Sequence, residues 1–168
     1  MVKRIFSGLV VALGFAATAA IAQPVRDTYQ DWLVECVDDS RESCVALQAM
    51  SQTIELEDGE EITQEMLRLV LRMSDDGQPI LQIRVPLGVD VRPGLVTQVD
   101  DGEEQNASYT VCTDAGCNVL MIPTEEQLSA WRNGSVIRVG YRAFGTTDAV
   151  VLEGSLLGFT AASEAVLN

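Results

Sequence analysis

Apolar and polar side chains alternate along several stretches of this chain. In residues 66–73, Leu67, Leu69 and Leu71 occupy every second position, with arginines and a valine between them. The same period of two recurs in residues 80–85 and 135–143. Because successive side chains of a strand point to opposite faces, this period predicts strands with one buried face.

Shorter apolar runs bounded by turn residues extend the same pattern. They predict further strands over residues 32–37, 44–50, 95–99 and 149–152. Turn-forming residues, often Asp or Gly, separate the runs at short intervals. Residues 23–29 lack a clear pattern, and we expect them to be a loose leader. The chain as a whole is predicted to be mainly β, an antiparallel β-sandwich or barrel-like domain.

One or two short helices interrupt this pattern. Thr124-Glu125-Glu126-Gln127 matches a capping box, in which a Thr side chain and a Gln side chain satisfy the first backbone amides of a helix. Leu128 and Trp131 follow with helical spacing, and Gly134 is placed to end the helix. Residues 158–167 favour a second short helix or a turn.

The N-terminus has the pattern of a secretory signal peptide. Lys3 and Arg4 precede an uncharged apolar run, and Ala20-Ile21-Ala22 provides a small-x-small cleavage site. The alternative is a membrane anchor, but this run is shorter than the ~20 apolar residues that a span requires. We therefore expect residues 1–22 to be removed, leaving no membrane span and a periplasmic or secreted protein.

The remaining chain, residues 23–168, has the length of a single domain and is strongly acidic. Removing Lys3 and Arg4 leaves nine basic residues against twenty-five acidic ones, a formal charge of −16. Such a surface repels phosphate backbones, so we expect no nucleic-acid partner.

Two residue types that catalysis often uses are missing. The chain contains no histidine, and no lysine follows Lys3. This excludes Ser-His-Asp and Cys-His catalysis and Schiff-base lysines. We therefore expect neither an enzyme nor a cofactor, although acid–base chemistry by paired carboxylates stays open as an alternative.

Four cysteines in an exported chain favour disulfides. Cys36 and Cys44 flank one polar turn, and Cys112 and Cys117 flank another. Of the three possible connectivities we expect these two local ones, because each pair can face across its own hairpin. A redox pair or a tetrathiolate metal site are the alternatives, and the spacing favours neither.

Two acidic turns, Glu57–Glu61 and Asp100–Glu104, are nearly copies of one another. They lack the alternate ligand spacing of a calcium-binding loop, so we predict solvated turns and no metal site. Paired carboxylates of a hydrolase would have to come from these same turns, and no aromatic platform is near them in sequence.

Arginines gather on the outward positions of the predicted strands. These candidate binding residues are Arg68, Arg72, Arg84, Arg138 and Arg142. If their strands share one sheet, the arginines form a basic stripe suited to an anionic ligand or a protein partner. The alternative is dispersed surface arginines paired with acids.

Three further side chains are expected in the core. Trp32 and Trp131 share strand or helix faces with apolar residues, which favours burial over a role as partner anchors. Gln48 lies among apolar neighbours and is predicted to be a buried amide with all its hydrogen bonds made, with a ligand contact as the alternative.

The order of several short motifs resembles the invasion-associated locus B family of exported bacterial proteins. The resemblance rests on Asp31-Trp32 before Cys36, Cys44 with Gln48, Pro86-Leu87-Gly88-Val89, the Cys112…Gly116-Cys117 hairpin and Gly158-Phe159-Thr160-Ala161-Ala162. It implies an all-β fold with a helix, export to the periplasm or outer envelope, and an origin in alphaproteobacteria. It carries no catalytic residue and no cofactor onto this chain.

Together these observations predict an exported cell-envelope protein that binds a protein or an anionic ligand, of unidentified nature. The alternatives are a carboxylate-based periplasmic hydrolase and a structural or stress-protective envelope component.

Overall fold

The computed structural model describes residues 24–40 and 42–167, so the predicted signal peptide lies outside the described residues. The strands are β1 (Val25–Tyr29), β2 (Trp32–Cys36), β3 (Cys44–Glu55), β4 (Glu61–Met73), β5 (Pro79–Val85), β6 (Leu95–Val99), β7 (Gln105–Ala107), β8 (Val111–Thr113), β9 (Gly116–Met121), β10 (Val136–Arg142) and β11 (Ala149–Ser155). The helices are α1 (Glu125–Asn133) and α2 (Phe159–Leu167).

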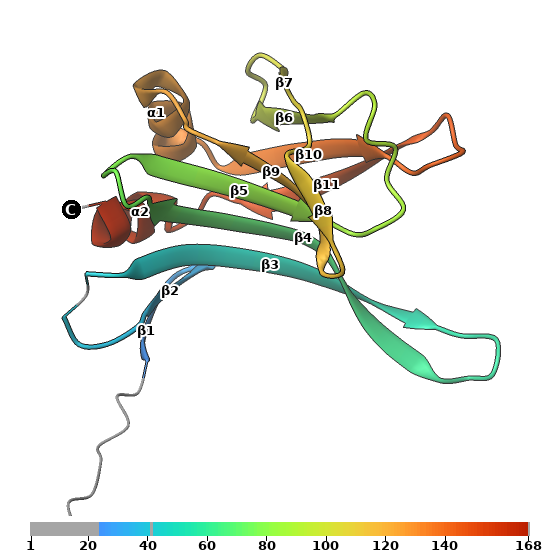
Figure 1. Ribbon diagram of the computed structural model, residues 1–168, viewed down its shortest axis with the longest axis horizontal. Coiled ribbons are helices and arrows are strands. Elements are labelled where there is room, and N and C mark those ends of the chain that lie inside the picture. The colour runs from blue at the N-terminus through green and yellow to red at the C-terminus, as the bar shows by residue number, and fades with distance from the viewer. Residues whose placement is uncertain (1–23, 41, 168) are drawn as a thin grey trace, which may run out of the picture.

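The strands form two open antiparallel sheets. One has seven strands in the order β1-β2-β3-β4-β5-β9-β8, and the other has four in the order β11-β10-β6-β7. Figure 1 shows both helices at one end of the molecule, while the outer parts of β3 and β4 project from the other end. The predicted β-sandwich is confirmed, and neither sheet closes into a barrel.

The alternation in the sequence corresponds to the inner faces of these sheets. Leu67, Leu69 and Leu71 of β4 are buried, as are Ile137 and Val139 of β10. Their arginine neighbours lie on the outer faces and are half-buried. The core therefore fills the space between the sheets, as the period of two predicted.

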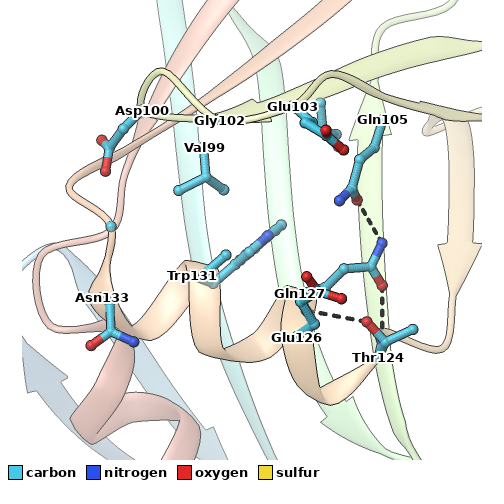
Figure 2. Close-up of a pocket in the computed structure, with 13 residues that line it drawn as sticks. Val99, Asp100, Gly102, Glu103, Gln105, Thr124, Glu126, Gln127, Trp131 and Asn133 are labelled. Carbon is cyan, nitrogen blue, oxygen red and sulfur yellow. Dashed lines mark hydrogen bonds between the residues drawn. The ribbon is translucent and has the colours of Figure 1, made fainter.

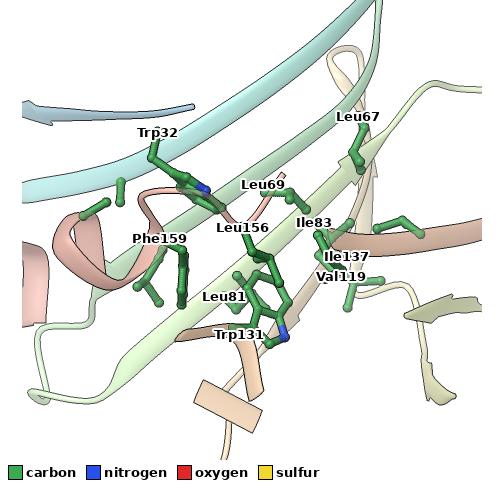
Figure 3. Packing of buried hydrophobic residues seen from close by; sticks show 14 of the residues in the cluster. Trp32, Leu67, Leu69, Leu81, Ile83, Val119, Trp131, Ile137, Leu156 and Phe159 are labelled. Carbon is green, nitrogen blue, oxygen red and sulfur yellow. The ribbon is translucent and has the colours of Figure 1, made fainter. Parts of the chain in front are cut away.

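An aromatic cluster closes the core at the helical end (Figure 3). Phe159 at the start of α2 lies between the two tryptophans, with ring centroids 5.0 Å from Trp32 and 5.4 Å from Trp131. Trp32 is 0% exposed and Trp131 is 6% exposed. Both tryptophans are core residues, as predicted.

The two local disulfides are confirmed. Cys36 of β2 lies opposite Cys44 of β3 and is bonded to it, and Cys112 of β8 is bonded in the same way to Cys117 of β9. Each bond therefore joins directly paired residues of one hairpin. Among the described residues no cysteine is free.

The prediction of a loose leader at residues 23–29 is wrong. Residues 25–29 form β1, which pairs along its whole length with β2, from Val25 opposite Cys36 to Tyr29 opposite Trp32. Gln30 at φ +52° allows the tight reversal between the two strands. Val25 and Tyr29 pack against the core, so β1 is an edge strand held by pairing and by partial burial.

The outer halves of β3 and β4 form a two-stranded arm, residues 51–65. Here Ser51 to Glu55 pair with Glu61 to Glu65, and no other strand of the described chain joins them, since β2 and β5 pair with the inner halves. A register shift between Met50 and Ser51 marks the point where the arm begins. The acidic turn Glu57–Glu61 lies at its tip.

Candidate functional site

The five candidate arginines do not form one stripe. Arg68 and Arg72 of β4 and Arg84 of β5 belong to the seven-stranded sheet, whereas Arg138 and Arg142 of β10 belong to the four-stranded sheet. The condition for a single stripe, that their strands share a sheet, is therefore not met. The arginines form two separate groups on the outer faces of the two sheets.

In the first group, Arg68 and Arg84 lie opposite each other and share Glu65. Arg84 Nη2 lies 2.6 Å from Glu65 Oε1, and Arg68 Nε lies 2.8 Å from Oε2. Burial raises the pKa of Glu65, but the hydrogen bonds from the two arginines outweigh it and leave this pKa below its ordinary value. Arg72 lies outside this cluster, and its Nη1 donates to the Met73 carbonyl at 3.4 Å.

In the second group, Arg142 contacts Asp90, which sequence analysis did not single out. Asp90 is 2% exposed and accepts bonds from Arg92 Nε and Nη2, each at 2.8 Å, and from Arg142 Nη2 at 2.6 Å. The hydrogen bond from Arg92 lowers the pKa of Asp90 most; burial opposes this, and Arg142 adds to the lowering. Asp90 thus fixes one end of β10 to the loop that precedes β6.

Arg138 lies four residues before Arg142 on the same face of β10. Its Nε donates to Glu153 Oε1 at 2.9 Å, and its Nη1 donates to the Asp100 carbonyl at 2.6 Å. Arg138 and Arg142 are each 37% exposed at the side chain. Both guanidinium groups are therefore oriented by the protein and still accessible.

A hollow of about 510 Å³ lies between these two arginines on the outer face of the four-stranded sheet. We call it the arginine groove, and it is lined among others by Val96, Arg138, Gly140, Arg142 and Val151. Gly140 lies midway between the arginines on β10 and leaves the floor open. A Cβ there would come no closer than 3.9 Å to Val96 and 4.0 Å to Val151. The groove thus has an apolar floor, an arginine at each end and one carboxylate, Glu104, in its lining.

A second hollow of about 510 Å³, the α1 pocket, lies between α1 and the acidic turn 100–104 (Figure 2). Glu103 and Gln105 line it on the side of the turn, and Glu126, Gln127 and Trp131 line it on the side of the helix. Sequence reasoning found this turn but placed no aromatic residue near it. The fold brings Trp131 there.

The β6–β7 hairpin separates the two hollows. Thr97, Val99 and Gln105 line the α1 pocket, whereas Val96, Gln98 and Asn106 line the arginine groove. Alternate residues of a strand point to opposite faces, so each hollow receives every second side chain. The two hollows are therefore independent sites on opposite sides of one hairpin.

The carboxyl groups with a clearly shifted pKa in the arginine clusters do not suit acid catalysis. The pKa values of Glu65 and Asp90 are both lowered, whereas a general acid at neutral pH needs a raised one. Within residues 24–40 and 42–167, no group of three Cys, Asp or Glu side chains is arranged to hold a metal ion. No helix in this part of the chain is long and apolar enough to cross a membrane.

Comparisons with known proteins agree on one family. The family model described as "Invasion associated locus B (IalB) protein" matches residues 32–167. Two proteins from Brucella abortus strains, each called an invasion protein B homolog, are 28% identical over 163 residues, which cover 96% of this chain and 90% of the relative. The crystal structure of invasion associated protein b from Bartonella henselae matches with a TM-score of 0.69 and 20% identity, over 85% of this chain and 96% of that one.

Proposed function

This chain belongs to the invasion associated locus B family, and from that membership we propose that it is an exported cell-envelope protein that acts by binding a partner rather than by catalysis. The Brucella and Bartonella proteins are named for invasion. For this chain we propose a protein partner within the cell envelope. The structural features described below form a docking surface, and none of them points to a host molecule.

Export is supported by the N-terminal pattern and by the cysteines. A basic start, an apolar run and a small-x-small site precede the folded domain. Both disulfides join residues of single hairpins, and such bonds persist in oxidising compartments. The mass of the native protein tests export: we expect a chain that begins at Gln23 and gains four hydrogens on reduction. A chain that retains Met1 or four free thiols contradicts export.

The observation that carries binding is the arginine groove. Its volume lies within the ~300–1,000 Å³ of ordinary ligand pockets, and an apolar floor with a few placed polar groups is their usual composition. Val151 is 58% exposed on that floor, a large apolar side chain left in water. On a protein with a formal charge near −16, two oriented guanidinium groups provide a local positive contact for an anionic partner, while the acidic remainder of the surface repels it.

The groove favours an extended anionic segment as its occupant. Arg138 and Arg142 are four residues apart on one strand, which places their backbones roughly 13 Å apart. Carboxylates spaced four residues apart on a partner strand match this separation, and a small apolar residue between them fits over Gly140. Arg138 Nη2 and Arg142 Nη1 are not used in the bonds described above, so each arginine offers a charge-assisted hydrogen bond to such a carboxylate.

Filling the groove tests this function directly. Gly140→Val adds a side chain where the distances above leave room, and valine also favours strands, so we expect the fold to be kept. Ala49→Val is the matched control, because Ala49 is exposed on β3 of the other sheet. Envelope extracts are passed over the immobilised wild type and both variants, and captured proteins are identified by mass spectrometry.

We expect the wild type and Ala49→Val to capture equal amounts of the same partner. The amount captured by Gly140→Val should be at least tenfold lower. Arg138→Gln should weaken the same capture and reduce its dependence on salt, since it removes one charge contact. Equal capture by all four proteins contradicts a binding role for the groove.

A further inference from the structure

The α1 pocket has walls that are fixed at both ends. At one end Asp100, at φ +47°, accepts hydrogen bonds from the backbone amides of Ser135 and Val136, both within 3.2 Å and just after α1. At the other end Gln127 Nε2 donates to Gln105 Oε1 (Figure 2). The turn is thus tied to the helix on both sides, and the hollow between them is formed before any ligand arrives.

The charge of this pocket differs from that of the arginine groove. Glu103 and Glu126 face it from opposite walls, and neither forms an ion pair with a described residue. Arg132, the neighbour of Trp131 on α1, donates to Ser163 Oγ at 3.3 Å. Arg138 directs its donors to Glu153 and to the Asp100 carbonyl. The pocket therefore offers carboxylate acceptors and repels anions.

The pocket also holds donors that the protein does not use. Trp131 is 6% exposed, and its indole nitrogen makes no hydrogen bond to any residue that the structure describes. Figure 2 shows the indole projecting from α1 between Val99 and Gln127. The Nε2 group of Gln105 is likewise unbonded within the described chain, since only its oxygen is engaged. Gln105 is exposed, and Trp131 Nε1 is not among the buried atoms without a partner, so both donors are open to the pocket and free to meet a ligand.

We propose that the α1 pocket is a binding site for an uncharged saccharide. Its ligand must donate to Glu103 and Glu126 and accept from Trp131 and Gln105. A hydroxyl group does both at once, whereas an ammonium group or a metal ion satisfies only the carboxylates and an anion only the donors. A sugar ring carries several hydroxyl groups in fixed directions, so one ring can meet acceptors and donors on both walls of the pocket.

The two indole groups of the protein provide the readout. Trp32 Nε1 donates to the Ser155 carbonyl at 2.9 Å in the core, so its signal in a proton–nitrogen correlation spectrum serves as an internal reference. The Trp131 signal is identified by its disappearance in Trp131→Phe. The uncharged probes are maltotriose and tri-N-acetylchitotriose, the anionic probe is trigalacturonic acid, and the cationic probe is spermidine.

We expect at least one uncharged trisaccharide to shift the Trp131 signal, with saturation below ~10 mM, and to leave the Trp32 signal in place. Trigalacturonic acid and spermidine should bind at least tenfold more weakly. The inference is overturned if neither uncharged sugar moves the Trp131 signal, or if spermidine binds as tightly as the better sugar.

A pair of charge-matched variants tests the site itself. Glu126→Gln should weaken the bound sugar at least fivefold, because a carboxylate is the stronger acceptor. Glu125→Gln removes the same charge from the same helical turn, but Glu125 does not line the pocket, so its affinity should match the wild type. Equal affinities in both variants would place the sugar elsewhere and overturn the assignment.

Discussion

Gln48 of β3 and Ser155 at the end of β11 exchange hydrogen bonds across the two sheets, although 107 residues separate them in the chain. Gln48 Nε2 donates to the Ser155 carbonyl at 3.0 Å, and the Ser155 amide donates to Gln48 Oε1 at 2.8 Å. The same Nε2 donates to the Asp31 carbonyl at 3.0 Å. Gln48 is 8% exposed, so the predicted buried amide with its bonds made is confirmed.

Removing this amide should destabilise the protein. Gln48→Met keeps the volume but leaves the Ser155 amide without its acceptor and two carbonyls with fewer donors, and we expect a loss of about 2–4 kcal/mol in the free energy of unfolding. Gln52→Met, on the exposed arm of the same strand, should change it by less than ~0.5 kcal/mol. Urea denaturation of both variants measures the difference. Equal midpoints would show that the amide does not hold the sheets together.

Gly158, just before α2, should tolerate no side chain. It has φ +89°, and a Cβ there would lie 2.0 Å from the carbonyl oxygen of Tyr29 in β1. Gly77→Ala is the matched control, because Gly77 has φ +73° with nothing within 4 Å of its Cβ position. We expect Gly77→Ala to cost only the backbone strain, about 1–2 kcal/mol, and Gly158→Ala to cost at least ~2 kcal/mol more. Thermal unfolding of the two variants measures the difference in their stability and so tests this prediction.

The ion pairs of Asp90 should make stability depend on acid pH. The pKa of Asp90 in the folded chain is below its ordinary value of 3.8, so the ionised carboxyl stabilises the fold above that value. This contribution is lost as the pH falls through the folded pKa. We therefore expect Asp90→Asn to be less stable than the wild type by a constant amount from about pH 7 to 5, with the gap narrowing below about pH 4.

Urea midpoints measured across this pH range test the Asp90 prediction. Asp76→Asn is the control, an exposed residue in the turn between β4 and β5. The urea midpoint of Asp76→Asn should depend on pH in the same way as the midpoint of the wild type. A gap between wild type and Asp90→Asn that stays constant down to pH ~2 would contradict the assigned role of the carboxyl.

The arm of β3 and β4 should be dispensable for folding. Replacing Thr53–Thr63 with Asn-Gly joins Gln52 to Gln64, which already face each other, through a two-residue hairpin turn. Within the part of the chain that the structure describes, the removed residues pair only with each other and are mostly exposed, so we expect the free energy of unfolding to change by less than about 1 kcal/mol. A shortened chain that fails to fold would show that the arm contributes to folding.

Several elements could be predicted from the sequence because they depend on contacts between residues close together in the chain. The capping box is one: Thr124 Oγ1 accepts from the Gln127 amide at 3.2 Å, and Gln127 Oε1 accepts from the Thr124 amide at 2.8 Å. The two disulfides are another, since each joins partners a few residues apart. Strand β1 was not predicted, because its apolar and polar residues alternate weakly and it is held as a strand by its pairing with β2.

The sequence by itself determined which face of β4, β5 and β10 is buried, where the first helix begins and which cysteines pair, because these depend on neighbours within about ten residues. Only the tertiary structure decided which sheet receives each arginine, that Glu65 and Asp90 bind pairs of them, and that Trp131 lies beside the acidic turn at 100–104. Those contacts arise when strands distant in the chain pair and two sheets pack. Which strands pair and how the sheets pack depend on the packing of many side chains across the core. No pattern of residues close in the sequence contains that information.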